Sequence, residues 1–289
     1  MAAHIRPAGL EDIDAVAGLL NERMNARIPI ERWRRILDYP FRPPEVERGW
    51  LAEDAGRIVG FMGTIYSDRP TAKGIRRFCD LSSWYLLADY RGSGVGDDLL
   101  RSGMAKPDVT YQTMTARRAT GRKIRALGFS VLDSTRSLFR PGANPGMGGL
   151  RLIADETAIR EKLTAAQRQR LDDHRGLDIH HAYLESDKTG TGTWLVWQRK
   201  LKGAAIAYHE VLHASDLSFL SQHASAIADC VCTGEAAVLA VDTRMLDECA
   251  DKGVVETIPL ARWYRSPDVA PRDIDHLYSE VLLLDQKLP

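Results

Sequence analysis

The sequence predicts an α/β (α+β) fold, with a mixed, mostly antiparallel central sheet flanked by helices. Apolar runs of strand length occur in pairs about turns, and segments with apolar residues at helical spacing lie between them. The order hairpin, helix, strand, helix, strand occurs twice along the 289 residues. We therefore predict a second half that repeats the architecture of the first, although residue-level similarity between the halves is weak.

The elements of the first half follow from this periodicity. A strand at Ile5 precedes a helix, and a second helix is stopped by Pro40. Two strands surround a turn at residues 54–56, and Gly128 occupies the helix-terminating position of a later helix. The remaining predictions are a strand over 76–87, a helix over 94–105, a strand over 108–115, a helix over 117–129 and a strand over 130–140.

The second half begins after a break. Residues 141–150 contain a run rich in glycine and proline that is typical of a linker. A charged helix over 155–175 follows. The other predicted elements are two strands over 193–213, a helix over 216–232, a strand over 236–242, a short helix over 243–253 and two extended runs, the last over 275–285. We predict domains at 1–140 and 151–289, with the buried strand Val281–Leu284 near the end.

Composition excludes some classes of protein. Lys plus Arg and Asp plus Glu both number 39, so the net charge is zero, which argues against a dedicated nucleic-acid binder. No run approaches the length of a membrane helix, and the first residues lack the apolar core of a signal peptide. The four cysteines lack zinc-site spacing. We expect a cytoplasmic protein with reduced thiols, no bound metal and no membrane span.

One loop carries the strongest functional signal. Residues 88–100 read ADYRGSGVGDDLL, with Gly92, Gly94 and Gly96 between a strand and a helix. A helix start exposes unpaired N–H groups and partial positive charge, and glycines let several of these groups converge on a phosphate. Arg91 adds a charged donor. The loop therefore predicts an anion site for a phosphate or diphosphate, with a ligand-free glycine turn as the alternative.

Two common phosphate motifs do not fit. A P-loop would end in Gly-Lys-Ser/Thr, which is absent here. A dinucleotide loop would place its third glycine later, whereas Asp97 and Asp98 follow Gly96. The loop also comes about 90 residues into the chain, after strands that are predicted to be antiparallel, which is unlike a first βαβ unit.

The loop resembles the diphosphate loop of the GNAT superfamily of acyl-CoA-dependent N-acetyltransferases. Arg91-Gly92-Ser93-Gly94-Val95-Gly96 matches its pattern Arg/Gln-x-x-Gly-x-Gly/Ala, and the segment Leu127–Phe129 resembles its later Leu-Gly-Phe. The opening strand and helix are also similar, so the resemblance covers residues 4–139. Residues 81–92 and Leu277–Glu280 are further similar to bacterial acyltransferase-like proteins linked to polysaccharide or cell-envelope synthesis.

The resemblance implies acetyl-CoA, or another acyl-CoA, as the co-substrate. Its diphosphate would lie on residues 91–96, and its pantetheine would pair with main-chain groups of Trp84 and Leu86. An acceptor amine or hydroxyl would attack the thioester directly, assisted by a base, an acid and an oxyanion donor. The family's usual tyrosine acid falls at Ile124 and its frequent asparagine at Arg117, so both standard side chains are missing.

Other residues can be weighed for these roles. Asp80 shares a strand face with Trp84 and is a candidate base, with a salt-bridged aspartate as the alternative. Tyr111 in the neighbouring strand is a candidate acid, with a core tyrosine as the alternative. Cys79 is a weaker candidate nucleophile, because this fold transfers the acyl group directly. His209 and His213 share a strand face in the second half and can border an acceptor or serve only in packing.

The second half, residues 150–289, shows no comparable glycine loop, so we expect a degenerate copy of the fold. It would wall the acceptor pocket or form a subunit interface, for example in a homodimer. Two functions remain open. One is transfer of an acetyl or short acyl group to an amine or sugar acceptor. The other is a non-catalytic acyl-CoA sensor or scaffold.

Overall fold

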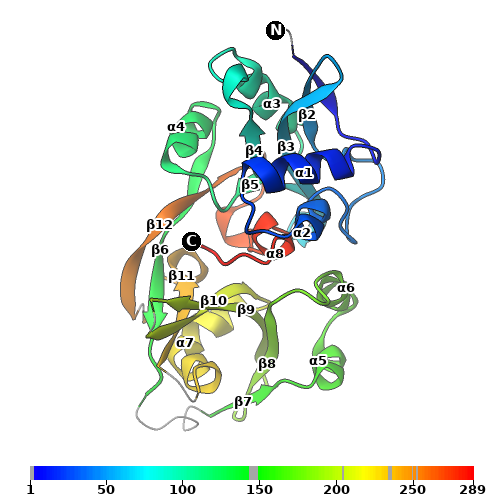
Figure 1. Ribbon diagram of the computed structural model, residues 1–289. Coiled ribbons are helices and arrows are strands. Elements are labelled where there is room, and N and C mark those ends of the chain that lie inside the picture. Colours follow the sequence, from blue (N-terminus) through cyan, green and yellow to red (C-terminus); the bar gives the residue numbers. More distant parts are fainter. Residues whose placement is uncertain (1–2, 143–148, 204, 234–235, 249, 252) are drawn as a thin grey trace. The chain divides into compact units, whose positions relative to one another are not determined.

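The computed structural model describes residues 3–142, 149–203, 205–233, 236–248, 250–251 and 253–289 (Figure 1). These residues form two compact units. Unit 1 comprises the described residues up to Ser130 together with Trp263–Asp273 and Tyr278–Gln286. Unit 2 comprises Val131–Arg262, Ile274–Leu277 and Lys287–Pro289.

The units differ in extent from the predicted domains 1–140 and 151–289. Residues 131–140 are part of unit 2, and two segments near the C-terminus are part of unit 1. Most of the predicted linker, residues 143–148, lies outside the described residues. The division into a functional first domain and a degenerate second domain stays a prediction.

Unit 1 contains a mixed sheet in the order β1-β2-β3-β4-β5-β12. Neighbours are antiparallel except for β4 and β5, which are parallel. Its strands are β1 (His4–Pro7), β2 (Trp50–Asp54), β3 (Arg57–Thr71), β4 (Gly74–Leu86), β5 (Thr110–Thr113) and the last residues of β12 (Val254–Arg265). Its helices are α1 (Ile13–Arg23), α2 (Ile30–Arg35), α3 (Val95–Gly103), α4 (Arg118–Ala126) and α8 (Glu280–Leu283), with the 3-10 turns η1 (Ala88–Tyr90) and η3 (Pro271–Asp273).

The core of unit 1 forms where α1 and α2 cover the sheet. Apolar side chains recur at helical spacing on α1 and meet the buried side chains of β2 and β3. Leu283 and Leu284 of the C-terminal segment belong to the same cluster. Figure 1 shows α8, in red, beside α2. This segment therefore completes the core of the unit that contains the chain's first residues.

Unit 2 repeats this plan. Its sheet has the order β12-β6-β11-β10-β9-β8-β7, and the pair β10 and β11 is parallel. Its strands are β6 (Ser130–Phe139), β7 (Leu150–Ile153), β8 (His180–Ser186), β9 (Gly192–Lys202), β10 (Ile206–Ala214), β11 (Ala237–Asp242) and most of β12. Its helices are α5 (Glu156–Lys162), α6 (Ala165–Asp173) and α7 (Leu217–Val231), with the 3-10 turn η2 (Thr243–Met245).

The repeat predicted from element order is confirmed. In each unit four neighbouring strands pair antiparallel, and the fourth also pairs with a fifth strand in parallel. These strands are β1 to β5 in unit 1 and β7 to β11 in unit 2. α7 packs within a large apolar cluster on the sheet of unit 2. The predicted mixed, mostly antiparallel sheet with flanking helices is also confirmed.

Three local predictions are wrong. The single helix over 155–175 is two helices, because Thr164 caps α6 through a capping box with Gln167 and ends the preceding turn. The short helix predicted over 243–253 is only the 3-10 turn η2, although residues 249 and 252 lie outside the described residues. The expected strand Val281–Leu284 lies mainly in α8, where all four side chains are buried because a single helical turn is enclosed on all sides.

Among the helices that the structure describes, none combines the length and apolar character needed to cross a membrane.

We expect Leu283→Ala to destabilise unit 1. Leu283 is 2% exposed in the core cluster, so truncation leaves a cavity and lowers the free energy of unfolding by about 2–5 kcal/mol. The control is Leu10→Ala, at a leucine that is 65% exposed in the same unit. We expect it to change the free energy of unfolding by less than about 0.5 kcal/mol. Denaturant unfolding measures both. Equal effects of the two variants would contradict a C-terminal segment built into the core.

Candidate functional site

A cavity of about 800 Å³ lies in unit 1. Its walls come from β4, from the loop before α3, from α4 and from the segment that holds Glu280. The lining residues are Arg23, Met24, Met62, Leu81, Ser82, Ser83, Trp84, Tyr85, Leu86, Arg91, Gly92, Gly94, Gly96, Asp97, Leu100, Thr113, Thr115, Ala116, Arg117, Thr120, Lys123, Ile124 and Glu280. The cavity is therefore built at the glycine loop that the sequence singles out.

The cavity lies where two parallel strands stop pairing. β4 and β5 are in register from Phe78 opposite Thr110 to Asp80 opposite Gln112. β4 then continues to Leu86, whereas β5 ends at Thr113. Because the strands no longer share a ladder there, main-chain groups of β4 are left for other partners.

An irregularity in β4 marks the same place. The register between β3 and β4 shifts between Phe61 and Gly63, which pair with Tyr85 and Ser82. Ser83 lies in the shifted stretch and has a φ of 49°, a left-handed conformation that costs a non-glycine residue energy. Bulges of this kind re-aim neighbouring side chains and main-chain groups. The strain is concentrated at a residue that lines the cavity.

The glycine loop is open to a ligand. Gly92 and Gly94 have φ values of 82° and 92°, which other residues rarely adopt. Gly96 has no such φ, and a side-chain Cβ there would meet Trp84 and Leu86 at ordinary distances of 3.5 and 3.6 Å. Gly94 is the N-cap of α3 and provides no side-chain cap. The missing side chains thus keep the first amides of α3 accessible for an anion.

Side chains around the loop fix it and add charge. The Trp84 indole Nε1 donates to the Gly96 carbonyl at 3.0 Å, and Arg91 Nε donates to the Leu86 carbonyl at 3.0 Å. Lys123 forms an ion pair with Asp97. Arg23, Arg91, Arg117 and Lys123 line the cavity against the carboxylates Asp97 and Glu280, so cations prevail there. This balance suits a multiply charged anion.

The structure reveals a site residue that sequence reasoning left without a role. Glu280 is 7% exposed and lines the cavity at the start of α8. Its Oε2 accepts from the Ser83 backbone N–H at 3.2 Å and from the Ser83 hydroxyl at 3.3 Å, and Thr115 donates to its Oε1. The only signal in the sequence is the run Leu277–Glu280, noted above for its resemblance and not for chemistry.

The predicted base, Asp80, lies elsewhere. It is fully buried in β4 and is not among the described residues that line the cavity. Its Oδ2 accepts from the backbone N–H of Glu280 at 2.8 Å. Burial, followed by repulsion from Glu280, raises the pKa of Asp80 well above its usual range. Its role as base stays a prediction that the cavity geometry does not favour.

The predicted acid, Tyr111, is also fully buried and absent from the described lining. Its hydroxyl accepts from the Lys106 backbone N–H at 3.0 Å. Burial raises the pKa of Tyr111, so it is a poor proton donor near neutrality. Ile124 and Arg117, at the positions of the family's tyrosine and asparagine, both line the cavity. The cofactor-binding candidates Trp84, Leu86, Arg91, Gly92, Gly94 and Gly96 line it as well.

Other candidates belong to packed regions. Cys79 is fully buried, and burial raises the pKa of its thiol, so a reactive thiolate is disfavoured. In unit 2, Trp197 donates to His209 at 3.0 Å, and His213 lies 2.9 Å from Asp275. Neither histidine lines the cavity of unit 1.

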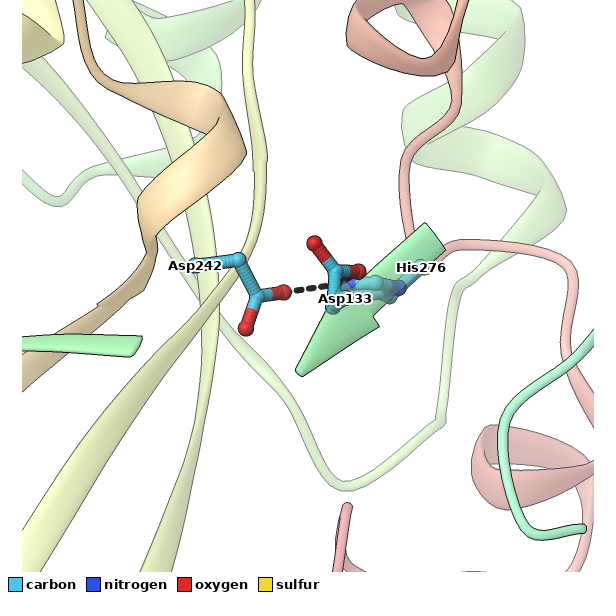
Figure 2. A group of neighbouring side chains, drawn as sticks. All are labelled: Asp133, Asp242 and His276. Carbon is cyan, nitrogen blue, oxygen red and sulfur yellow. Dashed lines mark hydrogen bonds and ion pairs between the residues drawn. The ribbon is translucent and has the colours of Figure 1, made fainter. Parts of the chain in front are cut away.

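A buried cluster in unit 2 has ligand types that suit a metal. Figure 2 shows Asp133, Asp242 and His276, whose ligand atoms lie within 4.8 Å of one another. Arg262 Nη1 also contacts Asp242 and lies 3.6 Å from Asp133, and Arg244 Nε donates to Asp133 at 2.7 Å. Two guanidinium groups thus already supply the positive charge that a cation would bring, which favours a buried ion-pair network.

Unit 2 has no counterpart of the glycine loop in its described residues. β10 ends at Ala214 and α7 begins at Leu217, so only Ser215 and Asp216 connect them. The Asp216 side chain accepts from the Phe219 N–H at 2.9 Å and caps α7. The carboxylate therefore occupies the place that an anionic ligand would take at a bare helix start.

Comparisons with known proteins agree with this fold. Residues 13–106 match the model of the Acetyltransferase (GNAT) family, which confirms the sequence resemblance to a GNAT domain over that range. No curated protein matches the chain.

Solved structures match nearly the whole chain at low identity. One is a conserved protein of unknown function from Enterococcus faecalis, called a probable N-acyltransferase: it is 12% identical, covers 92% of this chain and 73% of that one, and has a TM-score of 0.59. A GCN5-related N-acetyltransferase from Kribbella flavida is 12% identical, covers 92% of this chain and 72% of that one, and has a TM-score of 0.56. Another, from Anabaena variabilis, is 10% identical, covers 91% of this chain and 72% of that one, and has a TM-score of 0.54. These matches confirm the GNAT fold.

One histidine of unit 2 yields a testable pH dependence. His181 stacks on Trp194 with ring centroids 5.9 Å apart, and burial, with further repulsion from His174, lowers its pKa to about 4. In the unfolded chain its pKa is about 6.5. As the pH falls, His181 therefore binds a proton in the unfolded chain before it does so in the folded one. The free energy of unfolding decreases as a result between about pH 6.5 and pH 4. Above that window His181 contributes no pH dependence.

We expect His181→Phe to keep the stacking and to flatten the fall in stability of unit 2 across that window. Urea unfolding at pH 7, 6, 5 and 4.5 measures the slope for both proteins. The same slope in the variant and the unchanged protein would contradict a half-buried His181 whose pKa is lowered.

Proposed function

We propose that this protein is an acyl-CoA-dependent N-acyltransferase that moves an acetyl or other short acyl group to the amine, or hydroxyl, of a small-molecule acceptor. The observation that carries the proposal is the joint presence, in one cavity, of an open amide loop at residues 91–96 and the Glu280 carboxylate. The GNAT match over residues 13–106 supports acyl-CoA as the donor.

The residues present fit coenzyme A. The amides at the start of α3 and the Arg91 and Lys123 cations suit its diphosphate. The separation of β4 from β5 after Asp80 leaves main-chain groups of β4 for the amides of the pantetheine arm. When bound, acyl-CoA supplies the activated thioester, and the lining residues Ser83 and Thr115 hold the Glu280 carboxylate in the same cavity.

Glu280 is the group best placed to act as the base. Its carboxylate takes the proton that the acceptor nitrogen loses as the nitrogen bonds to the acyl carbon and the carbon–sulfur bond breaks. The proton then passes to the departing thiolate, so the products are the amide and the free thiol. The hydrogen bonds from Ser83 and Thr115 keep the carboxylate aimed at the cavity. A carboxylate also attracts a protonated amine.

The alternative, a non-catalytic acyl-CoA sensor, rests on the isoleucine at the position of the family's tyrosine acid. Ile124 does line the cavity and offers no proton. The presence of Glu280 in the same cavity favours the enzyme over the sensor. We propose a small amine or a sugar as the acceptor. A role in polysaccharide or cell-envelope synthesis stays a sequence-based expectation.

We expect Gly94→Glu to abolish acetyl-CoA binding, because a carboxylate at the start of α3 repels the diphosphate and fills its place. Gly176→Glu is the matched control, since Gly176 in unit 2 also has a left-handed φ, 79°, and open space around it. Isothermal titration calorimetry measures both. Unchanged affinity in the Gly94 variant would remove the site.

We expect Glu280→Gln to lower kcat by about 10²–10⁴-fold, the range for loss of a general base. Acetyl-CoA affinity should not change, because the diphosphate site is intact. Thiol release from acetyl-CoA with a panel of amines and amino sugars gives kcat. Asp285→Asn, in the same segment and paired with Arg32 outside the cavity lining, is the control. Full activity of the Glu280 variant, or binding without turnover by the unchanged protein over the whole panel, would contradict the proposed enzyme.

A further inference from the structure

We propose that Asp80 is a positioning residue that holds the backbone of Glu280 and thereby aims its carboxylate into the cavity. The inference rests on the proposed function, in which Glu280 is the base. It assigns to Asp80 a task different from the direct proton abstraction that its place in the sequence suggests.

The contact between the two residues joins segments 200 positions apart in the chain. Asp80 Oδ2 accepts from the Glu280 backbone N–H at 2.8 Å. That N–H is the first of α8, one of the amides that a helix leaves unpaired at its start. The carboxyl group on β4 thus caps α8 from outside the helix.

Glu280 is thus held at both ends. Its main chain is tied to Asp80, and its carboxylate is tied to Ser83 on β4 and to Thr115 just after β5. Because the side chain has several rotatable bonds, fixing both ends selects one direction for the carboxylate. Displacement of a reacting group by about 1 Å can cost on the order of 10² in rate. Loss of the Asp80 contact should therefore reduce turnover without touching the diphosphate loop.

Burial argues against Asp80 itself as the base. Its side chain is fully buried, and its Oδ1 has no hydrogen-bond partner among the described residues. The groups that act on it are Glu280, Arg69, Gln112 and the adjacent Cys79, and burial together with the charge of Glu280 raises its pKa. A carboxyl group can accept this hydrogen bond whether or not it carries a proton. An enclosed carboxyl group outside the described cavity lining suits positioning and does not suit proton abstraction from an acceptor.

Two variants distinguish a positioning role of Asp80 from a role as the base. Asp80→Asn keeps the shape and an acceptor oxygen, so we expect kcat to stay within about threefold, as for a retained hydrogen bond. Asp80→Ala removes the acceptor, so we expect kcat to fall by about 10- to 100-fold. KM for acetyl-CoA should be unchanged in both. The pH profile of kcat should keep its shape in Asp80→Asn, because the proposed base is a different residue.

Thr110→Val is the control for the loss of a buried polar group. Thr110 lies on the adjacent strand, outside the described cavity lining, and its hydroxyl is bonded to Ser266 at 2.7 Å. We expect its kcat to be unchanged. If Asp80→Asn were as inactive as Asp80→Ala and its pH profile of kcat were changed, Asp80 would be the base and the inference would be overturned. A Thr110→Val loss equal to that of Asp80→Ala would assign the effect to stability and overturn it as well.

A second measurement does not require activity. Hydrogen exchange of the Glu280 amide, followed by mass spectrometry on the full chain, should lose protection in Asp80→Ala and keep it in Asp80→Asn. Unchanged protection in Asp80→Ala overturns the positioning role. If the unchanged protein binds acetyl-CoA and transfers nothing, the proposed enzyme fails, and the exchange comparison still decides whether Asp80 holds Glu280.

Discussion

The site depends on the place where β4 and β5 stop pairing. Up to Asp80 the parallel ladder satisfies both strands, and beyond it β4 has to find other partners for its main-chain groups. At Ser83 the backbone enters a left-handed conformation, and its N–H is taken by the Glu280 carboxylate. This contact ties the segment of Glu280 to the strand and keeps its carboxylate in the cavity that the glycine loop also lines. The position of the proposed base therefore depends on this separation.

The two units share one plan and differ in the residues at the start of the helix that joins their parallel strands. In both units a helix, α3 or α7, connects the two strands of the parallel pair. In unit 1 a loop with three glycines leaves the helix start bare, whereas in unit 2 Asp216 caps it after a connection of two residues. A helix start attracts negative charge in either case. In unit 2 the chain itself supplies that charge, and in unit 1 the proposed diphosphate would supply it.

The sequence predicts the fold because periodicity, a local signal, indicates the strands and helices. Gly92, Gly94 and Gly96 line the cavity, and their role as an anion site stays a prediction. Sequence reasoning failed where tertiary contacts decide the outcome. The run Val281–Leu284 is apolar at every position, which does not distinguish a buried strand from an enclosed helical turn. Glu280 could not be placed, because its partners Asp80, Ser83 and Thr115 are more than 160 positions away. Asp80 attracted attention as the nearby carboxylate, yet its burial only appears in the folded chain.

The most direct test of the central claim is a crystal structure of the protein with acetyl-CoA bound. The account predicts the diphosphate on the amides of residues 92–96, the pantetheine along β4 beyond Asp80, and the thioester next to Glu280 with the Ser83 contact intact. Coenzyme A bound elsewhere, or bound with Glu280 turned out of the cavity, would contradict it.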